Sequence, residues 1–253
     1  MLTETKTAIS VKDRTVQFLW QHILLLISLY IMTLGVALTV RSCLGSSVIS
    51  SLPMALALAG SEGLAPALTI GGYTNVMNIL LVVCQILILR RQFERAQLLQ
   101  LVMGFVFGAL IDVNMALTAV ADYSPVWMRI AAQGAGCTVL AVGIAMEVRC
   151  GSVTMPGEGI NVAVSRVTGM AFAKTKIIVD CTLVALAVAA CYIFWGRWIW
   201  SIIGPGTLFA MFYVGWMVRV IGARMSWFER LLGYRPGMRR YVYGLARFIS
   251  RGQ

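Results

Sequence analysis

The sequence predicts an all-α polytopic membrane protein, built as an inverted repeat with three transmembrane helices and one re-entrant half-helix in each half. Three observations lead to this fold class. The first is composition: of 253 residues, 59% are hydrophobic and 12% are charged, and the mean hydropathy is +0.83. Soluble domains have about 45–50% apolar and about 25% charged residues. The second is a series of long apolar segments, and the third is a pattern that occurs twice.

Six apolar segments come close to the roughly 20 residues that a helix needs to cross the hydrocarbon core of a bilayer. They are residues 18–40, 73–89, 98–118, 126–148, 175–195 and 202–221. Two further apolar segments, 50–60 and 157–168, are shorter. At about 1.5 Å per residue, a helix of about a dozen residues covers ~18 Å, little more than half of the core. Each follows a stretch rich in Ser, Gly or Pro that interrupts the preceding helix.

The positions of basic residues indicate whether the short segments cross the membrane. Cytoplasmic loops of membrane proteins carry an excess of Lys and Arg, and residues 1–17 contain three such side chains. If both short segments return to the side from which they enter, the basic stretches 90–95, 166–176 and 222–253 all lie on the side of the N-terminus. If both cross, 90–95 lies on the opposite side. The charge pattern therefore predicts two re-entrant helices and cytoplasmic N- and C-termini.

The two interrupted stretches align without gaps at a separation of 108 residues. Identical residues in this alignment are Gly35, Ala37, Val40 and Arg41 in the first half and Gly143, Ala145, Val148 and Arg149 in the second. Further on, 101–112 resembles 208–219 and pairs Gly108 with Gly215. Because three crossings is an odd number, the second half enters the membrane from the opposite side. The expected domains are a cytoplasmic N-terminal segment (1–17), two membrane repeats (18–118 and 126–221) and a basic tail (222–253).

Three motifs resemble those of the bacterial YczE/YyaS/YitT-like membrane proteins. They are "GVALTVRSCLG" at 35–45, "PGEGI" at 156–160 followed by Lys176 and Asp180 at a spacing of four, and "GTLFAMFYVG" at 206–215. The resemblance covers about residues 20–221. It implies a multi-pass protein of the bacterial inner (plasma) membrane and implies no particular substrate.

Glu158 is the strongest candidate for a functional side chain. It lies in the first turn of the second predicted short helix, where the helix dipole and the free N–H groups favour a carboxylate. Ionisable groups at membrane depth are rare and usually functional, so Glu158 could bind a cation or a cationic substrate, or carry a proton. The structural alternative is a capping carboxylate that only satisfies backbone donors.

Two aspartates and two arginines are further candidates within or beside the predicted spans. Asp180 and Asp112 could bind an ion, or could pair with basic residues as structural elements. For Asp180, a helical spacing of four from Lys176 permits a local ion pair. Arg41 and Arg149 occupy equivalent places in the two halves, where they could bind an anionic substrate, fix the breaks or extend to lipid headgroups.

Smaller polar groups could complete the lining of a site, although many such groups in membranes only bridge helices. They are Ser50, Ser51, Asn75, Asn78 and Asn161. Glu147 is placed to pair with Arg149. The single histidine, His22, and six scattered cysteines without a CxxC pair predict no metal, disulfide framework or other cofactor.

The net charge of +11 is concentrated near the C-terminus, where seven arginines lie from Arg224 to Arg251. From Met238 onward, apolar residues recur at helical spacing among the arginines, as in an amphipathic helix on a membrane surface. The tail is therefore predicted to bind anionic lipid headgroups, and nucleic-acid binding is not expected.

These features favour a transporter or channel for a small polar or charged solute, with ion or proton coupling and a polar path between the two short helices near mid-bilayer. The alternative is a non-transporting accessory or assembly protein. An enzyme is not expected, because no Ser/His, Cys/His or metal constellation is evident, and no GxxxxGK[ST] stretch indicates nucleotide-driven transport. Both functions are compatible with a homo-oligomer.

Overall fold

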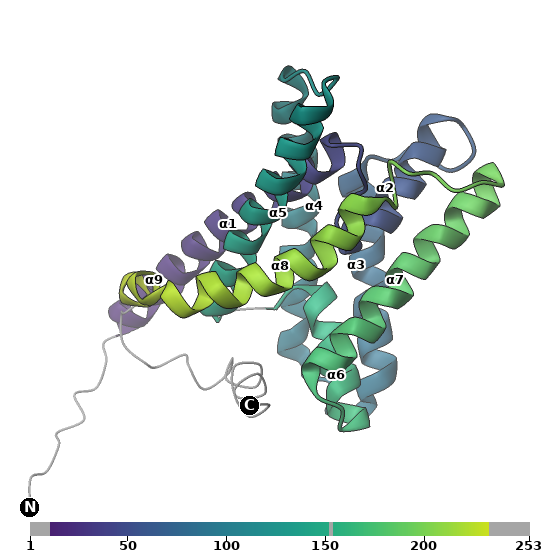
Figure 1. Ribbon diagram of the computed structural model, residues 1–253. Helices are drawn as coiled ribbons and strands as arrows, with labels where there is room; N and C mark the ends of the chain where they lie inside the picture. Colours follow the sequence, from purple (N-terminus) through teal and green to yellow (C-terminus); the bar gives the residue numbers. More distant parts are fainter. Residues whose placement is uncertain (1–10, 152–153, 233–253) are drawn as a thin grey trace, which may run out of the picture.

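The computed structural model describes residues 11–151 and 154–232, and all regular secondary structure in these ranges is helical (Figure 1). Six helices are long and apolar enough to cross a membrane. They are α1 (Val11–Arg41), α3 (Ile70–Leu89), α4 (Leu99–Leu117), α5 (Val126–Cys150), α7 (Phe172–Trp195) and α8 (Pro205–Arg224). The prediction of an all-α protein with six membrane-spanning helices is confirmed. The domain boundaries stay a prediction.

The remaining helices are short. They are α2 (Val48–Ser61), α6 (Pro156–Thr168), α9 (Ser226–Leu231) and the 3-10 turns η1 (Arg90–Gln92), η2 (Arg95–Leu98) and η3 (Thr118–Val120). Helix α6 begins with Pro156, whose missing N–H costs nothing in a first turn. It ends at Gly169, which adopts the left-handed conformation with a φ of +71°.

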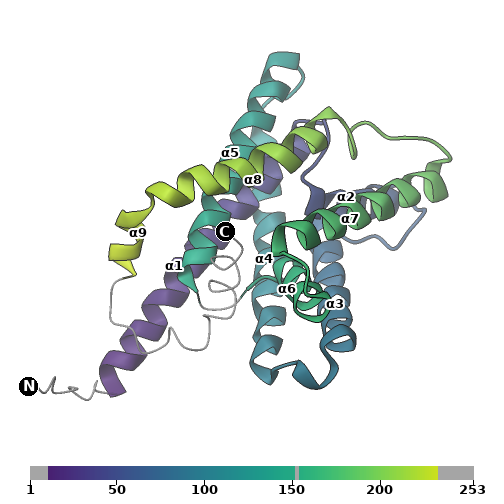
Figure 2. The ribbon, with the colours of Figure 1, turned by 60° about the horizontal axis from the view of Figure 1, so that its bottom comes forward.

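Helices α2 and α6 do not extend from one end of the molecule to the other. The connections α2–α3, α4–α5 and α7–α8 gather at the upper end in Figure 1, and the connection α6–α7 lies at the lower end. Figure 2 shows the α3–α4 hairpin at the end opposite the α4–α5 connection. The connections before and after each short helix thus lie at the same end of the molecule. This agrees with the prediction that neither α2 nor α6 crosses the membrane.

Helices α1 and α5 pack antiparallel through glycines. A Cβ atom on Gly35 would lie 2.7 Å from Leu140 Cα, and one on Gly143 would lie 2.6 Å from the backbone nitrogen of Met32. In the 108-residue alignment, Gly35 pairs with Gly143 and Met32 pairs with Leu140. The two contacts are therefore equivalent. Reciprocal contacts of this kind are what a two-fold axis between two similar halves produces. The inverted repeat itself stays a prediction.

The other helices form two groups around this pair. Helix α4 packs on α1 and α8 packs on α5, while α2, α3, α6 and α7 form a ring in which each helix packs on its two neighbours. Helices α3 and α4 join the two groups through Asn78, whose Nδ2 donates to the backbone oxygen of Gly104 at 3.4 Å. In the second half, α7 and α8 diverge from their shared connection and do not pack along each other (Figures 1 and 2).

The outward faces of these helices are apolar. Ile193, Phe212 and Leu87 are 77%, 75% and 67% exposed. Apolar patches of this extent mark a contact with lipid or protein, because soluble monomers rarely expose them to water. The chain is a multi-pass membrane protein.

The α1–α5 contact can be tested by adding side-chain volume to a glycine. We expect Gly143→Val to destabilise the protein by about 1–3 kcal/mol or to prevent folding, because the new methyl groups would meet the backbone of Met32. Gly134→Val, on the same helix, is the matched control, because no atom lies within 4 Å of a Cβ there. Thermal unfolding in detergent measures both, and equal losses of stability would contradict this packing.

Candidate functional site

The connection before α2, residues 42–47, is closed by hydrogen bonds to the connection before α8. The N–H of Ser46 donates to the oxygen of Ile202 at 3.0 Å, and the N–H of Gly206 donates to the oxygen of Leu44 at 2.8 Å. Gln133 fills the remaining space: it donates to the oxygen of Gly206 at 2.8 Å and accepts from Ser42 at 2.7 Å. The first interruption of the membrane helices is therefore a packed junction.

Ser50 and Ser51 are buried in this junction and bond to their own helical turn. The hydroxyl oxygens of Ser47 and Ser50 are 2.6 Å apart, and Ser51 donates to the oxygen of Val48 at 2.7 Å. These contacts support the structural alternative for both serines.

The start of α6 differs, because two carboxyl groups lie there. Glu147, near the end of α5, is 3% exposed. Its Oε1 accepts from the N–H of Met155 at 3.2 Å, and its Oε2 has no hydrogen-bond partner among the described residues. Glu158, in the first turn of α6, is partly buried, and its N–H donates at 3.0 Å to the oxygen of Met155, the residue whose own N–H bonds Glu147. The sequence predicts Glu158 as a functional residue, but it predicts that Glu147 pairs with Arg149.

Glu158 also interacts with two charged groups on α7. Lys176 attracts it and Asp180 repels it, while Lys176 Nζ and Asp180 Oδ2 form an ion pair at 3.1 Å. The ion pair that the helical spacing permits is therefore present. With side-chain exposures of 48% and 17%, it is worth only about 0.3–0.5 kcal/mol of stability. The structure thus gathers Glu147, Glu158, Lys176 and Asp180 in one region, which we call the acidic cluster.

Amide side chains surround the first two turns of α6. Gln85 Nε2 donates to the oxygen of Pro156 at 3.1 Å, and Asn161 Nδ2 donates to the oxygen of Gly157 at 3.1 Å. A Cβ on Gly159 would lie 2.5 Å from Oε1 of Gln100, so the ends of the two glutamine side chains approach the backbone of α6 closely at this glycine. The side-chain oxygens of Gln100 and Asn161 are buried without a partner in the described part of the chain.

The two short helices meet through apolar side chains, which corrects the expectation of a polar path between them. The side chain of Ile49 packs directly on Gly157, where a Cβ would collide with it. Around this contact lies an apolar cluster of residues from all four helices of the ring. Its buried members are Val48, Met77, Leu81, Ile160 and Leu183. The polar residues of each break precede the helix or lie on its other faces.

Asp112 lies at the far end of α4 and holds the start of α3. Its Oδ1 accepts from the N–H of Gly71 at 2.9 Å, and its Oδ2 accepts from the hydroxyl of Thr69 at 2.7 Å. A carboxylate at a helix N-terminus is favoured by the free N–H groups and the dipole. These contacts support the structural alternative for Asp112.

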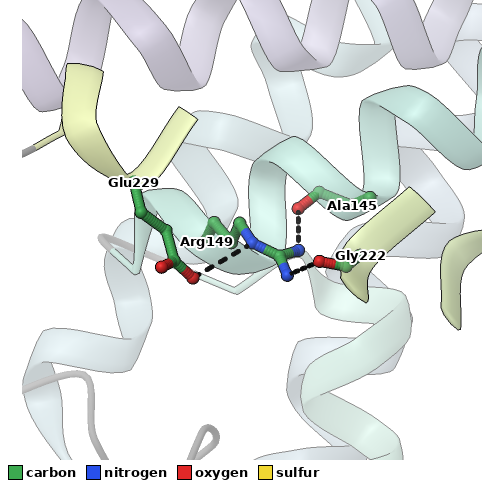
Figure 3. A network of polar contacts seen from close by, with 4 residues as sticks. All are labelled: Ala145, Arg149, Gly222 and Glu229. Carbon is green, nitrogen blue, oxygen red and sulfur yellow. Dashed lines mark hydrogen bonds and ion pairs between the residues drawn. The ribbon is translucent and has the colours of Figure 1, made fainter. Parts of the chain in front are cut away.

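Arg41 and Arg149 make equivalent contacts in the two halves. Arg41 Nη2 donates to the oxygen of Met115 in the last turn of α4 at 2.7 Å. Arg149 donates to the oxygen of Gly222 in the last turn of α8 and to that of Ala145 at 3.2 Å (Figure 3). Carbonyl groups at a helix C-terminus carry partial negative charge. Both arginines therefore join the first helix of their half to the end of the last.

Glu147 does not pair with Arg149, contrary to the sequence prediction. The Nε atom of Arg149 instead lies 3.4 Å from Oε1 of Glu229 on α9 (Figure 3). Phe228 of α9 is fully buried, and Trp20 Nε1 donates to the oxygen of Leu231 at 2.9 Å. Helix α9 is thus fixed against α1 and α5, and this contact leaves Glu147 free to face α6.

The structure brings together only part of the predicted site. Glu158, Asp180 and Asn161 lie near one another, whereas Asn78 lies between α3 and α4. Sequence reasoning missed Gln85 and Gln100. Their signal is a polar amide in each of two consecutive apolar spans, near the ends that flank the same basic connection. The predicted amphipathic tail from Met238 and residues 1–10 lie outside the described residues.

One family model matches the chain over residues 19–223, from the first apolar span almost to the end of α8. Its description is a family of unknown function (DUF6198). No curated protein and no solved structure matches the chain. The function is therefore inferred from the geometry of the site.

The arginine contacts predict a specific effect on α9. We expect Arg149→Gln to speed hydrogen exchange of the α9 amides, because charged hydrogen bonds to backbone oxygens contribute about 1.5–3 kcal/mol and the Glu229 contact is also lost. Arg224→Gln, an exposed arginine in the last turn of α8, is the matched control. Unchanged exchange in the Arg149 variant would show that the contact does not hold α9.

Proposed function

We propose that this chain, which belongs to the DUF6198 family of unknown function, is a secondary transporter for a small polar or charged solute, coupled to protons or another cation. The observation that carries the proposal is Glu147, a carboxyl group that is 3% exposed inside a membrane protein and lies beside Glu158. Ionisable side chains within a membrane are costly and usually belong to an ion pathway or a proton relay.

The architecture around these carboxyl groups supports the proposal. Transporters built from inverted repeats place their sites at discontinuous helices, whose N-termini lie within the bundle. The start of α6 is such a place: Glu147, Gln85 and Gln100 surround it from three other helices. The apolar contact of Ile49 with Gly157 then serves as the closed gate between this site and the other end of the protein.

The two halves differ in a way that suits alternating access. In the first half, Gly108 lets α4 pack closely on Asn75 of α3. Its counterpart in the second half, Gly215 on α8, has no atom within 4 Å of a Cβ. Two halves of an inverted repeat can exchange conformations, which opens the site to each side in turn. In the exchanged state, α7 would pack on α8 and α3 would separate from α4.

The finer assignments belong to the same proposal. We place the protein among the YczE/YyaS/YitT-like proteins of the bacterial inner membrane, with both termini in the cytoplasm. The arginine-rich tail binds anionic headgroups, and neither nucleic acid nor an enzymatic reaction enters the proposal. The competing function is that of an accessory or assembly protein, which would need no solute pathway. A homo-oligomer is compatible with either function.

Solute uptake separates the two functions. We expect purified protein in liposomes to take up a solute from a broad panel under a pH gradient, and Glu158→Gln to reduce uptake at least tenfold. Glu94→Gln removes the same charge from an exposed residue of the α3–α4 connection and should leave uptake unchanged. A folded protein that moves no solute would favour the accessory function.

The exchange of conformations predicts movement between α7 and α8. Spin labels at Ala185 on α7 and Gly215 on α8, with the exposed Cys43, Cys84 and Cys181 replaced by Ser, should give two distance populations. Their ratio should change with pH or with a transported solute. A label pair on α1 and α5 serves as the rigid control and should give one population. A single, unchanging distance between α7 and α8 would contradict the exchange.

A further inference from the structure

We infer that Glu147 and Glu158 form a proton-binding pair, so that the coupling ion of the proposed transporter is a proton. The inference rests on the proposed function for its physiological meaning, but proton binding itself can be measured without transport. It depends on the surroundings of Glu147, on the charges nearby and on the placement of the remaining oxygens.

The surroundings of Glu147 disfavour an ionised carboxylate. The neighbouring residues Met146, Cys150 and Met155 are 6%, 3% and 5% exposed and belong to the apolar core between α1, α5 and α9. One carboxyl oxygen accepts a single neutral N–H, and the other accepts nothing from the described residues. A buried charge needs pairing as well as hydrogen bonds, and from the described residues this carboxyl group receives one neutral bond.

Among the described residues, the charged groups nearby pair with other partners than Glu147. Arg149, two residues along α5, turns to Gly222 and to Glu229 of α9. On α7, Lys176 is paired with Asp180.

Further titratable groups lie toward this end of the described residues. Glu158 on α6 repels it, and Cys150 on α5 lies beside it. On α1, the titratable residue toward this end is the partly buried His22. With Arg149 and Glu229 neutralising each other, the acidic cluster holds three carboxyl groups and one ammonium group. A proton on the Glu147–Glu158 pair removes the repulsion between them.

The geometry favours a proton over a metal cation. A metal ion needs several oxygens that converge on one point, and the unpaired oxygens here belong to Glu147, Gln100 and Asn161. Gln100 contacts α6 at Gly159, while Asn161 leaves the helix on nearly the opposite face, since successive residues are about 100° apart. These oxygens cannot surround one ion together with Glu147. A proton needs only the carboxyl groups.

The pair has a route to water through α7. Glu158 interacts with Glu147 on one side and with the partly exposed Lys176–Asp180 pair on the other. A proton released from Glu147 can therefore leave by way of Glu158 toward Asp180, whereas the apolar cluster around Ile49 contains no group that could carry it. This arrangement gives the site access from one side only, as coupling requires.

Infrared difference spectroscopy on the purified protein tests the inference directly. We expect the carbonyl stretching band of a protonated, buried carboxyl group at neutral pH in the unmodified protein. Glu147→Gln should abolish the band, and the matched control Glu94→Gln should leave it unchanged. In Glu158→Gln, the band should shift in frequency, because the neighbour of the protonated carboxyl group is replaced. Absence of the band at neutral pH, or its persistence in Glu147→Gln, would overturn the inference.

Further measurements distinguish a bound proton from a bound metal cation, and the failure of this inference from the failure of the proposed function. Sodium chloride at constant ionic strength should not displace the band, and a sodium-dependent loss would mean that a metal cation takes the place of the proton. If Glu147→Gln does not fold, the frequency shift of the band in Glu158→Gln decides instead, and an unchanged band would overturn the inference. A band without any solute uptake would refute the proposed function alone. Uptake that depends on Glu158 without a band would refute the proton pair alone.

Discussion

Backbone that leaves a helix inside a membrane must find partners for its N–H and C=O groups within the protein, because the hydrocarbon core offers none. This constraint applies at two places in the chain, before α2 and before α6. At the first, Ser46, Leu44 and Gln133 bond to the connection before α8, and the junction is packed. At the second, side chains meet the start of α6, and several buried oxygens have no partner in the part of the chain that the structure describes. The difference between the two breaks gives the second its potential for chemistry.

The rest of the architecture holds these breaks in position. Glycines bring α1 and α5 together, so the two helices that precede the breaks support each other. Arg41 and Arg149 then join each of these helices to the end of the last helix of its half. The contacts follow the 108-residue alignment, but α3 packs on α4 whereas α7 stands apart from α8. Similar sequences in two different packings are what an alternating mechanism needs.

Much of the fold could be predicted because it depends on local properties. Hydropathy and length identify the six spanning helices, and Pro156 and Gly169 mark the beginning and the end of α6. Glu158 was found for the same reason, since a carboxylate in a first turn within an apolar region is a local signal. The balance of charges in the connections also favoured re-entry, and the positions of the connections in the structure agree with it.

What could not be predicted depends on which helices face each other. Glu147 is two residues from Arg149, and only the position of α9 shows that this arginine turns to Glu229. Gln85 and Gln100 come from different helices and meet at Gly159 only through tertiary packing. The apolar contact between the short helices was missed because polar residues follow Ile49 and Gly157 in the sequence, whereas the two helices meet on their apolar faces. Rotation of a helix about its axis is set by its neighbours.

We propose that α2 and α6 enter the membrane from opposite faces and that neither crosses it. Single cysteines at Glu62, just after α2, and at Met170, just after α6, can be labelled in intact cells with a membrane-impermeant maleimide, after the native exposed cysteines are replaced. The account predicts that Glu62→Cys reacts from outside and that Met170→Cys reacts only after the membrane is permeabilised. Labelling of both positions from the same face would contradict it.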